Sequence, residues 1–320
     1  MAPSDSLTLP SATFAKLSPH PFLLANLQPP NPSTPPSRAN GRQTRHARPY
    51  NINASSLCHA HGSAVVRSGD TTVICGVRGE ILLTTQIPNY STPNPAEPTN
   101  ELGGYDLIVP NVELSTGCDP NHLPGVPPTT LAQSLSTSIY SLLDKSRLLN
   151  AEDFRIYNED EERVVKAYWV LYIDILFISL DGNPFDIALA AVVAALRDTK
   201  LPLAYWNEEL EMVLCRRPTP TRAPTPLRIN GLPVACTAAI FTEKKNQKKG
   251  EGRYWMLIDP DRFETKMCHE TVVIVLDKTT GSPVILSISK HGGAVVEQQL
   301  LKEFAVVAEA RWNQFHAALP

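Results

Sequence analysis

The stretch from Lys166 to Pro202 constrains the fold of this chain more than any other part of the sequence. It opens with a mostly apolar run, Tyr168 to Leu180, which is rich in β-branched and aromatic residues. A run of this length and composition predicts a strand that is buried on both faces. A turn at Asp181-Gly182-Asn183 follows the strand.

The helix predicted after this turn has a clearly marked start. Asn183 stands at the N-cap position, Pro184 at the first helical position and Asp186 in the first turn. From Ile187 to Leu196 the segment is aliphatic on all sides, so we expect the helix to lie inside the molecule. A buried strand that leads into a buried helix indicates the centre of a large core.

The composition is that of a globular protein. Hydrophobic residues make up 42% of the chain, and no apolar run reaches the roughly 18 residues that a membrane span needs. The N-terminus lacks the basic-then-apolar order of a secretory signal. The net charge of −3 argues against strong nonspecific binding of nucleic acid by the whole surface. Six cysteines without a C-x-x-C pair predict free thiols, and we expect no metal and no cofactor: Cys58, Cys75, Cys118, Cys215, Cys236 and Cys268.

Residues 1–37 predict an N-terminal extension. The apolar clusters Phe14–Leu17 and Phe22–Leu27 indicate a short helix or docking segment, and PPNPSTPPS after them indicates an extended proline-rich linker. Four arginines then follow within eleven residues and are candidates for binding the phosphates of RNA: Arg38, Arg42, Arg45 and Arg48. The alternative is a solvated surface turn with ion pairs.

The remainder predicts two similar α+β halves, 38–217 and 218–320, each with helices on one side of a mixed sheet. In the first half, Ser68-Gly69-Asp70 predicts a hairpin turn, 105–112 a strand and Thr129–Lys145 an amphipathic helix. The apolar stripe of that helix consists of Leu131, Leu135, Ile139, Leu142 and Leu143. The proline-rich stretch 218–226 is the candidate boundary between the halves.

In the second half, four segments predict strands and 294–317 predicts a final helix; the strand segments are 232–241, 254–258, 270–276 and 284–289. Glu243–Arg253 indicates a basic hairpin insertion, most simply a solvated loop.

Several of these segments carry the pattern of a known family. GSAVVRSGDTTVICGVRGE resembles the opening hairpin of the ribonuclease PH family, and RANGR at 38–42 resembles the start of its domain, RPDGR, with two departures. LIVPNVELS and WVLYIDILFISLDGNPFDIALAAVVAALRDTKLP resemble the non-catalytic ring subunits of the eukaryotic RNA exosome. The resemblance covers about residues 38–316 and implies the RNase PH fold (ribosomal protein S5 domain 2-like), with two βαβα-type halves.

Active members of that family cleave RNA from its 3′ end with inorganic phosphate as the nucleophile. This chemistry requires arginines to hold a dianion and a carboxylate near the scissile bond. In active members the helix that matches Thr129–Lys145 carries a Gly-Arg-Ser group and further arginines. This chain has Gln133, Thr137 and Ser138 in that region, and no arginine.

The turn after the central strand departs in the same way. Bacterial members have an arginine where this chain has Phe185, and the family acid five residues before the turn's aspartate matches Leu176. Asp174 and Asp181 remain, but seven residues apart on a strand they point to opposite faces unless a bulge intervenes. Asp186 is explained better as a first-turn acid than as a catalyst. The resemblance therefore implies degenerate active-site positions at Gln133, Thr137, Ser138, Leu176, Asp181 and Phe185.

The first hypothesis is a structural, catalytically inactive subunit of the exosome ring, in which Phe14–Leu27 docks on a neighbouring subunit. The family then implies these partners: other RNase PH-like ring subunits, cap subunits with S1 and KH domains, a processive exoribonuclease, and RNA in the channel. It also implies rRNA processing and RNA turnover in the nucleus, nucleolus and cytoplasm, and no membrane partner. Two alternatives remain open: a phosphorolytic exoribonuclease, active alone or with a pairing subunit, and a free-standing RNA-binding module that uses Arg38–Arg48 and Lys244–Lys249.

Overall fold

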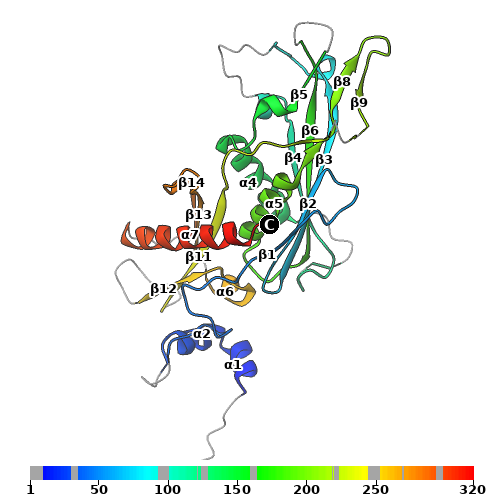
Figure 1. Cartoon of the computed structure of the whole chain (residues 1–320). Coiled ribbons are helices and arrows are strands. Elements are labelled where there is room, and N and C mark those ends of the chain that lie inside the picture. The colour runs from blue at the N-terminus through cyan, green and yellow to red at the C-terminus, as the bar shows by residue number, and fades with distance from the viewer. Residues whose placement is uncertain are drawn as a thin grey trace, which may run out of the picture.

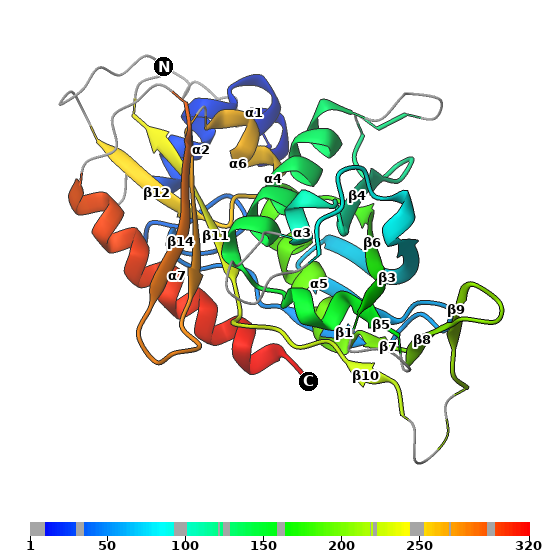
Figure 2. The same cartoon turned by 90° about the horizontal axis from the view of Figure 1, so that it is seen from above.

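Two β-sheets with helices between them make up the protein (Figures 1 and 2). The computed structural model describes residues 10–29, 35–92, 101–120, 122–123, 129–158, 164–217, 219, 223–243, 253–268, 270–292 and 298–320. In Figure 2, α4 (Thr130–Ser146) and α5 (Pro184–Asp198) lie between the sheets, and α7 (Gln298–Ala318) covers the outer face of the second sheet. The α+β class predicted from the sequence is confirmed.

The first sheet is built from six strands in the order β1-β2-β3-β6-β4, with β5 also paired to β6. The strands are β1 (Asn51–Ala54), β2 (Gly62–Ser68), β3 (Thr71–Leu83), β4 (Ile108–Leu114), β5 (Arg155–Tyr157) and β6 (Val165–Ser179). The β4–β6 pair is parallel and all the other pairs are antiparallel, so this sheet is mixed, as predicted. The predicted hairpin turn at Ser68-Gly69-Asp70 connects β2 and β3.

The prediction that the central strand is buried on both faces is correct only for the first part of β6. Residues 167–171 are buried, but from Tyr172 onward one face opens to solvent, where Asp174 is exposed and Ile178 is 48% exposed. The physical reason is that helix α5 packs on one face of the sheet, against β2 and β3. The described elements leave the other face uncovered at this end.

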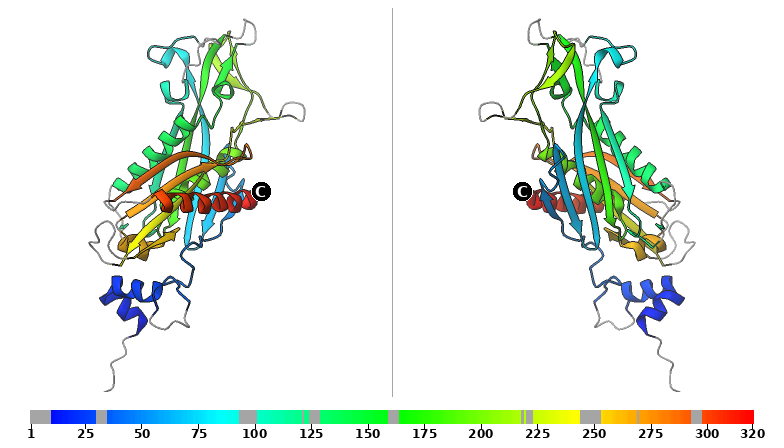
Figure 3. Two further views of the ribbon diagram at one scale, coloured as in Figure 1. Left: turned by 90° about the vertical axis from the view of Figure 1, so that its left-hand side faces the viewer. Right: turned by 90° about the vertical axis from the view of Figure 1, so that its right-hand side faces the viewer.

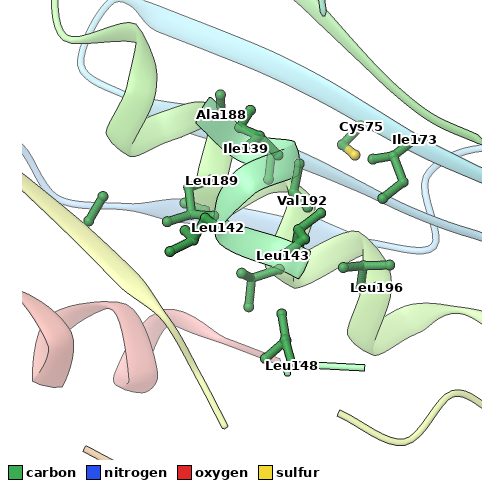
Figure 4. Packing of buried hydrophobic residues seen from close by; sticks show 14 of the residues in the cluster. Cys75, Ile139, Leu142, Leu143, Leu148, Ile173, Ala188, Leu189, Val192 and Leu196 are labelled. Carbon is green, nitrogen blue, oxygen red and sulfur yellow. The ribbon is translucent and has the colours of Figure 1, made fainter. Parts of the chain in front are cut away.

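The core lies where α4 and α5 pack together (Figure 4). Ile139, Leu142 and Leu143 of α4 lie beside residues of α5 that include Leu189 and Val192. The predicted stripe of α4 is buried except for Leu131, which is exposed at the side of the helix that faces the second sheet. Helix α5 is buried continuously from Asp186 to Leu196, as its composition predicted.

The second sheet differs from the prediction because it is not mixed. Its order is β12-β11-β13-β14, and every described pair is antiparallel. The strands are β11 (Val234–Thr242), β12 (Tyr254–Ile258), β13 (Glu270–Asp277) and β14 (Val284–His291). The β11–β12 and β13–β14 pairs join successive strands, whose connections are shorter than the crossover that a parallel pair needs. Phe304 and Phe315 of α7 are fully buried in the core beside it.

The N-terminal extension forms two helices, α1 (Ser11–Leu17) and α2 (Pro19–Leu27); α2 packs on the second sheet of the same chain and α1 packs on α2 (Figures 1 and 3). Leu23 and Leu27 are buried against Phe241 and Leu257, in a cluster separate from the main core. The predicted helix is therefore confirmed. In this structure α2 contacts the chain's own second sheet, and docking of Phe14–Leu27 on a neighbouring subunit stays a prediction.

Several small elements complete the fold: η1 (Thr84–Gln86), α3 (Glu101–Gly104), η2 (Ala151–Phe154), α6 (Arg262–Met267), and the pairs β7 (Lys200–Leu201) with β10 (Thr225–Pro226) and β8 (Ala204–Asn207) with β9 (Met212–Cys215). The β8–β9 hairpin and α6 were not predicted from the sequence. Most of the predicted insertion, 244–252, lies outside the described residues, as do parts of the boundary at 218–226. The division into two domains stays a prediction. None of the described helices is both long and apolar enough to cross a membrane.

Replacing Gly182 by alanine tests how closely the two halves approach. Gly182 has φ +72°, and a Cβ there would lie 2.5 Å from the carbonyl carbon of Asp261 and 2.6 Å from the oxygen of Pro260. We expect Gly182→Ala to lower the free energy of unfolding by about 3 kcal/mol or more, because overpacking adds to the cost of a left-handed backbone. Gly281→Ala is the control, since Gly281 has φ +90° but open space around it, and should cost about 1–2 kcal/mol. Equal shifts of the two urea midpoints would contradict the close approach.

Candidate functional site

A cleft of about 720 Å³ opens between α4, the start of α5 and strands β13 and β14. Thr137 and Ser138 reach it from α4, and Pro184 and Phe185 reach it from α5. The second sheet contributes Thr271 and Val273 of β13, together with four residues of β14. The cleft is therefore formed by both halves of the chain, and three of the six degenerate active-site positions line it: Thr137, Ser138 and Phe185.

The charges that line this cleft are few. Among the described lining residues, Lys145 and His291 are the only side chains able to carry a positive charge, and none is an arginine, an aspartate or a glutamate. The polar groups are mainly hydroxyls of α4 and β14. This chemistry can form hydrogen bonds, but it does not provide the fixed, bidentate cations that hold a phosphate dianion.

The predicted positions on α4 are turned back to their own helix. The Oγ1 of Thr137 donates to the carbonyl oxygen of Gln133 at 2.9 Å, and the Oγ of Ser138 donates to that of Ser134 at 2.8 Å. Gln133 is exposed and is not among the residues that line the cleft. The hydroxyl protons of Thr137 and Ser138 are therefore used within the helix, which leaves these side chains as acceptors toward the cleft.

The acids of the central strand and turn do not come together. Asp174 lies on the exposed face of β6, where its Oδ1 accepts a hydrogen bond from Asn111 at 3.4 Å. Asp181 instead accepts from Nη1 of Arg48 at 3.0 Å and from the backbone N–H of Arg262 at 3.2 Å. Leu176 is half-buried on β6 and pairs with neighbouring strands, away from the cleft. The strand has a bulge near its end, but it does not give the two carboxylates a common partner.

Asp186 joins the two halves of the chain. It is buried, and it accepts from the backbone N–H of Thr237 at 2.8 Å and from the Thr237 hydroxyl at 2.6 Å. Asn183, expected as an N-cap, does not cap the helix with its side chain. It has φ +45°, and its Nδ2 donates to Asp186 at 2.8 Å. Burial raises the pKa of Asp186, although these hydrogen bonds oppose the shift.

Asp259, which the sequence analysis missed, is the centre of the polar network beneath the cleft. The backbone N–H and Nε of Arg48 donate to its Oδ2 at 2.9 and 2.8 Å, and Nη2 of Arg48 donates to its Oδ1 at 2.8 Å. Nδ2 of Asn183 also donates to Oδ1, at 3.0 Å. Burial alone would raise the pKa of Asp259, but Arg48 and Arg311 outweigh it and hold that pKa well below its usual range.

The four arginines proposed for RNA occupy very different places. Arg38 is fully buried, where it forms an ion pair with Glu264 and donates to the carbonyl oxygen of Ile258 at 2.6 Å. Arg48 is buried against Asp259, and Arg42 is mostly buried with its Nη1 3.3 Å from the same carboxylate. Arg45 is the exposed member, with 60% of its side chain accessible in a surface ion pair with Glu303. Neither alternative from the sequence describes Arg38 and Arg48, which bind carboxylates inside the chain.

Arg311 on α7 was missed as well. It is buried, its Nη1 donates to the carbonyl oxygen of Arg48 at 2.6 Å, and its Cζ lies 3.6 Å from the ring centroid of Tyr50. A signal was present in the sequence, since Arg311 continues the helical spacing of the buried residues Phe304 and Ala308. No group of three or more His, Cys, Asp or Glu side chains in the described part of the chain is placed to hold a metal ion.

Comparisons with known proteins agree with this architecture. Residues 46–202 match the family model described as "3' exoribonuclease family, domain 1". The chain is 33% identical over 275 residues to "Exosome complex component rrp43" of Schizosaccharomyces pombe, covering 86% of this chain and 87% of that one. It is 32% identical over 273 residues to "Exosome complex component Rrp42" of Methanothermobacter thermautotrophicus, covering 85% and 86%.

The fold is also that of solved structures. The protein matches a chain of the Archaeoglobus fulgidus exosome with RNA bound to the active site, with a TM-score of 0.67 and 22% identity, over 94% of this chain and 97% of that chain. It matches a chain of an archaeal exosome core with a TM-score of 0.63 and 22% identity, over 96% and 100%. The RNase PH fold implied by the sequence resemblance is confirmed.

Substitutions of Arg48 and Arg45 separate buried from exposed ion pairs. Arg48→Gln leaves Asp259 without its main partner in a buried place, so we expect it to lower the free energy of unfolding by about 3–5 kcal/mol. Arg45→Gln removes only an exposed pair and should change that free energy by about 0–1 kcal/mol. Urea denaturation measures both, and comparable losses for the two variants would contradict the assignment of Arg48 to the core.

The acid sensitivity of folding tests the low pKa of Asp259. In the folded chain this carboxyl stays ionised at pH values below the usual pKa of an aspartate, whereas in the unfolded chain its pKa is about 4. Its contribution is therefore present above about pH 4 and is lost as the pH falls toward the folded-state pKa. We expect the free energy of unfolding of Asp259→Asn, although lower at neutral pH, to fall less steeply on acidification than that of the original chain. Parallel pH profiles would count against this role.

Proposed function

The chain belongs to the RNase PH family of 3′ exoribonucleases, and on that premise we propose that it is a structural, catalytically inactive subunit of the exosome core ring. The two relatives named above are exosome components, and the likeness extends over most of their length. In this role the chain supports 3′-to-5′ processing and degradation of RNA, including rRNA maturation, while another subunit performs the cleavage.

The observation that carries this proposal is the charge of the cleft. An enzyme that uses phosphate as a nucleophile must neutralise a dianion and the charge that develops in the transition state. Here Phe185 stands where bacterial members have an arginine, and Lys145 and His291 are the only cationic side chains among the described lining residues. Asp181 binds Arg48 and Asp186 binds Thr237, so both carboxylates serve contacts within the chain.

The partners that fit this role are other RNase PH-like ring subunits, cap subunits with S1 and KH domains, and a processive exoribonuclease. A closed ring of different subunits requires two different contact patches on each subunit. We place the protein in the nucleus and nucleolus as well as the cytoplasm. Where its arginine segment contacts RNA, we assign the contact to Arg45, because the guanidinium groups of Arg38 and Arg48 are buried in ion pairs.

An activity assay separates this proposal from the alternative of a phosphorolytic enzyme. We expect the purified, folded chain to release no nucleoside diphosphates from single-stranded RNA in the presence of inorganic phosphate, because no arginine is among the described residues that line the cleft. An active family member serves as the positive control, and circular dichroism establishes folding. Phosphate-dependent release would overturn the assignment as inactive, and release only after addition of a co-purifying subunit would favour a shared active site.

A further inference from the structure

We propose that the cleft between α4 and β14 binds an extended segment of a different protein of the assembly, which adds a strand to the free edge of β14 and places a carboxylate beside Lys145. This inference rests on the proposed function, because a cleft released from catalysis is available to a partner. It deepens that function by naming the surface and the kind of partner segment.

The first observation is the edge of the second sheet. Within the described residues, β14 pairs only with β13, so its other side has unpaired backbone donors and acceptors. The strand is eight residues long, and its aliphatic side chains are open to solvent: Val284 is 48%, Ile285 44% and Ile288 52% exposed. An exposed apolar edge of this length is a template for pairing with another strand, and peptides recognised in this way bind through main-chain hydrogen bonds.

The second observation is that this edge borders the cleft. Leu286, Ser287 and Ser289 of β14 line it on one side, and Leu131 and Ser138 of α4 line it on the other. A strand added beside β14 would direct alternate side chains into this space of about 720 Å³. Walls that mix aliphatic groups with hydroxyls suit apolar side chains and small polar ones.

The third observation is an acceptor without a donor. The Oδ1 of Asn183 has no hydrogen-bond partner among the described residues, although the side chain is only 4% exposed and lines the cleft. The Nδ2 of the same amide donates to Asp186 and Asp259, so the unpaired atom is the oxygen. A buried acceptor without a partner is unfavourable, so the wall of the cleft at Asn183 has an unmet hydrogen-bonding group.

The charge of the site indicates the chemistry of the partner. Lys145 and His291 lie in a cleft whose described lining includes no carboxylate, so an acidic residue or a free C-terminus on the segment would complement them. A second copy of this chain would present another β14, whose sequence VILSISKH has no acidic residue. The pairing of complementary charges therefore favours a different protein over self-association.

Hydrogen–deuterium exchange of the purified assembly tests the proposal. We expect β14 amides that point away from β13 to exchange at least roughly tenfold more slowly in the assembly than in the isolated chain. Lys145→Glu should return their exchange toward the rate of the isolated chain. Lys302→Glu, an exposed lysine on α7 outside the cleft lining, is the matched control and should leave the protection unchanged.

The possible outcomes separate a failure of the docking site from a failure of the proposed function. An assembly of different proteins in which β14 exchanges as fast as in the isolated chain overturns the docking site and leaves the proposed function standing. Protection that appears in the isolated chain as its concentration rises, with dimers in sedimentation, overturns the choice of a different protein as partner. Protection that both lysine variants retain overturns the role of Lys145. Failure of the chain to join any assembly overturns the proposed function and this inference together.

Discussion

The structure depends on one buried ion pair between residues that are 211 positions apart, Arg48 and Asp259. Arg48 lies just before the first strand of the first sheet, and Asp259 follows β12 of the second sheet. Both oxygens of the carboxylate are occupied, by the Arg48 guanidinium, the Arg48 backbone N–H and the Asn183 amide. Buried charges are tolerated only when they are fully paired. The two halves must therefore meet in one geometry to complete this network.

This network also determines which side chains in and below the cleft are available to a bound molecule. The turn that begins α5 supplies Asp181, Asn183 and Asp186, and all three side chains are engaged with residues of the chain itself. Carboxylates held in this way stabilise the contact between the halves and are not positioned for a substrate. Phe185 adds to the same effect, because it packs against the core and presents an apolar ring to the cleft. At these positions the side chains stabilise the fold and are not arranged to bind a substrate.

Local patterns predicted the elements near Lys166–Pro202 well, because strand and helix signals depend on neighbouring residues. The bounds of α5 and the turn before it agree with the prediction to within a residue or two. The burial of β6 agreed with the prediction only in part, because composition cannot tell whether a covering layer extends along the whole strand. Asp259 and Arg311 were missed for a different reason. Their roles depend on partners far away in the sequence, which no local spacing reveals.

The same distinction applies to the cleft, whose described lining includes no arginine and no carboxylate. The core between α4 and α5 includes aliphatic side chains that do not line the cleft, such as Ile139 and Val192. Because those side chains lie behind the lining, their packing does not depend on cationic groups in the cleft. What remains is a rigid surface with an open strand edge at β14 and a lysine beside it. Those features suit an extended protein segment, as proposed above, better than they suit a phosphate dianion, which needs fixed cations around it.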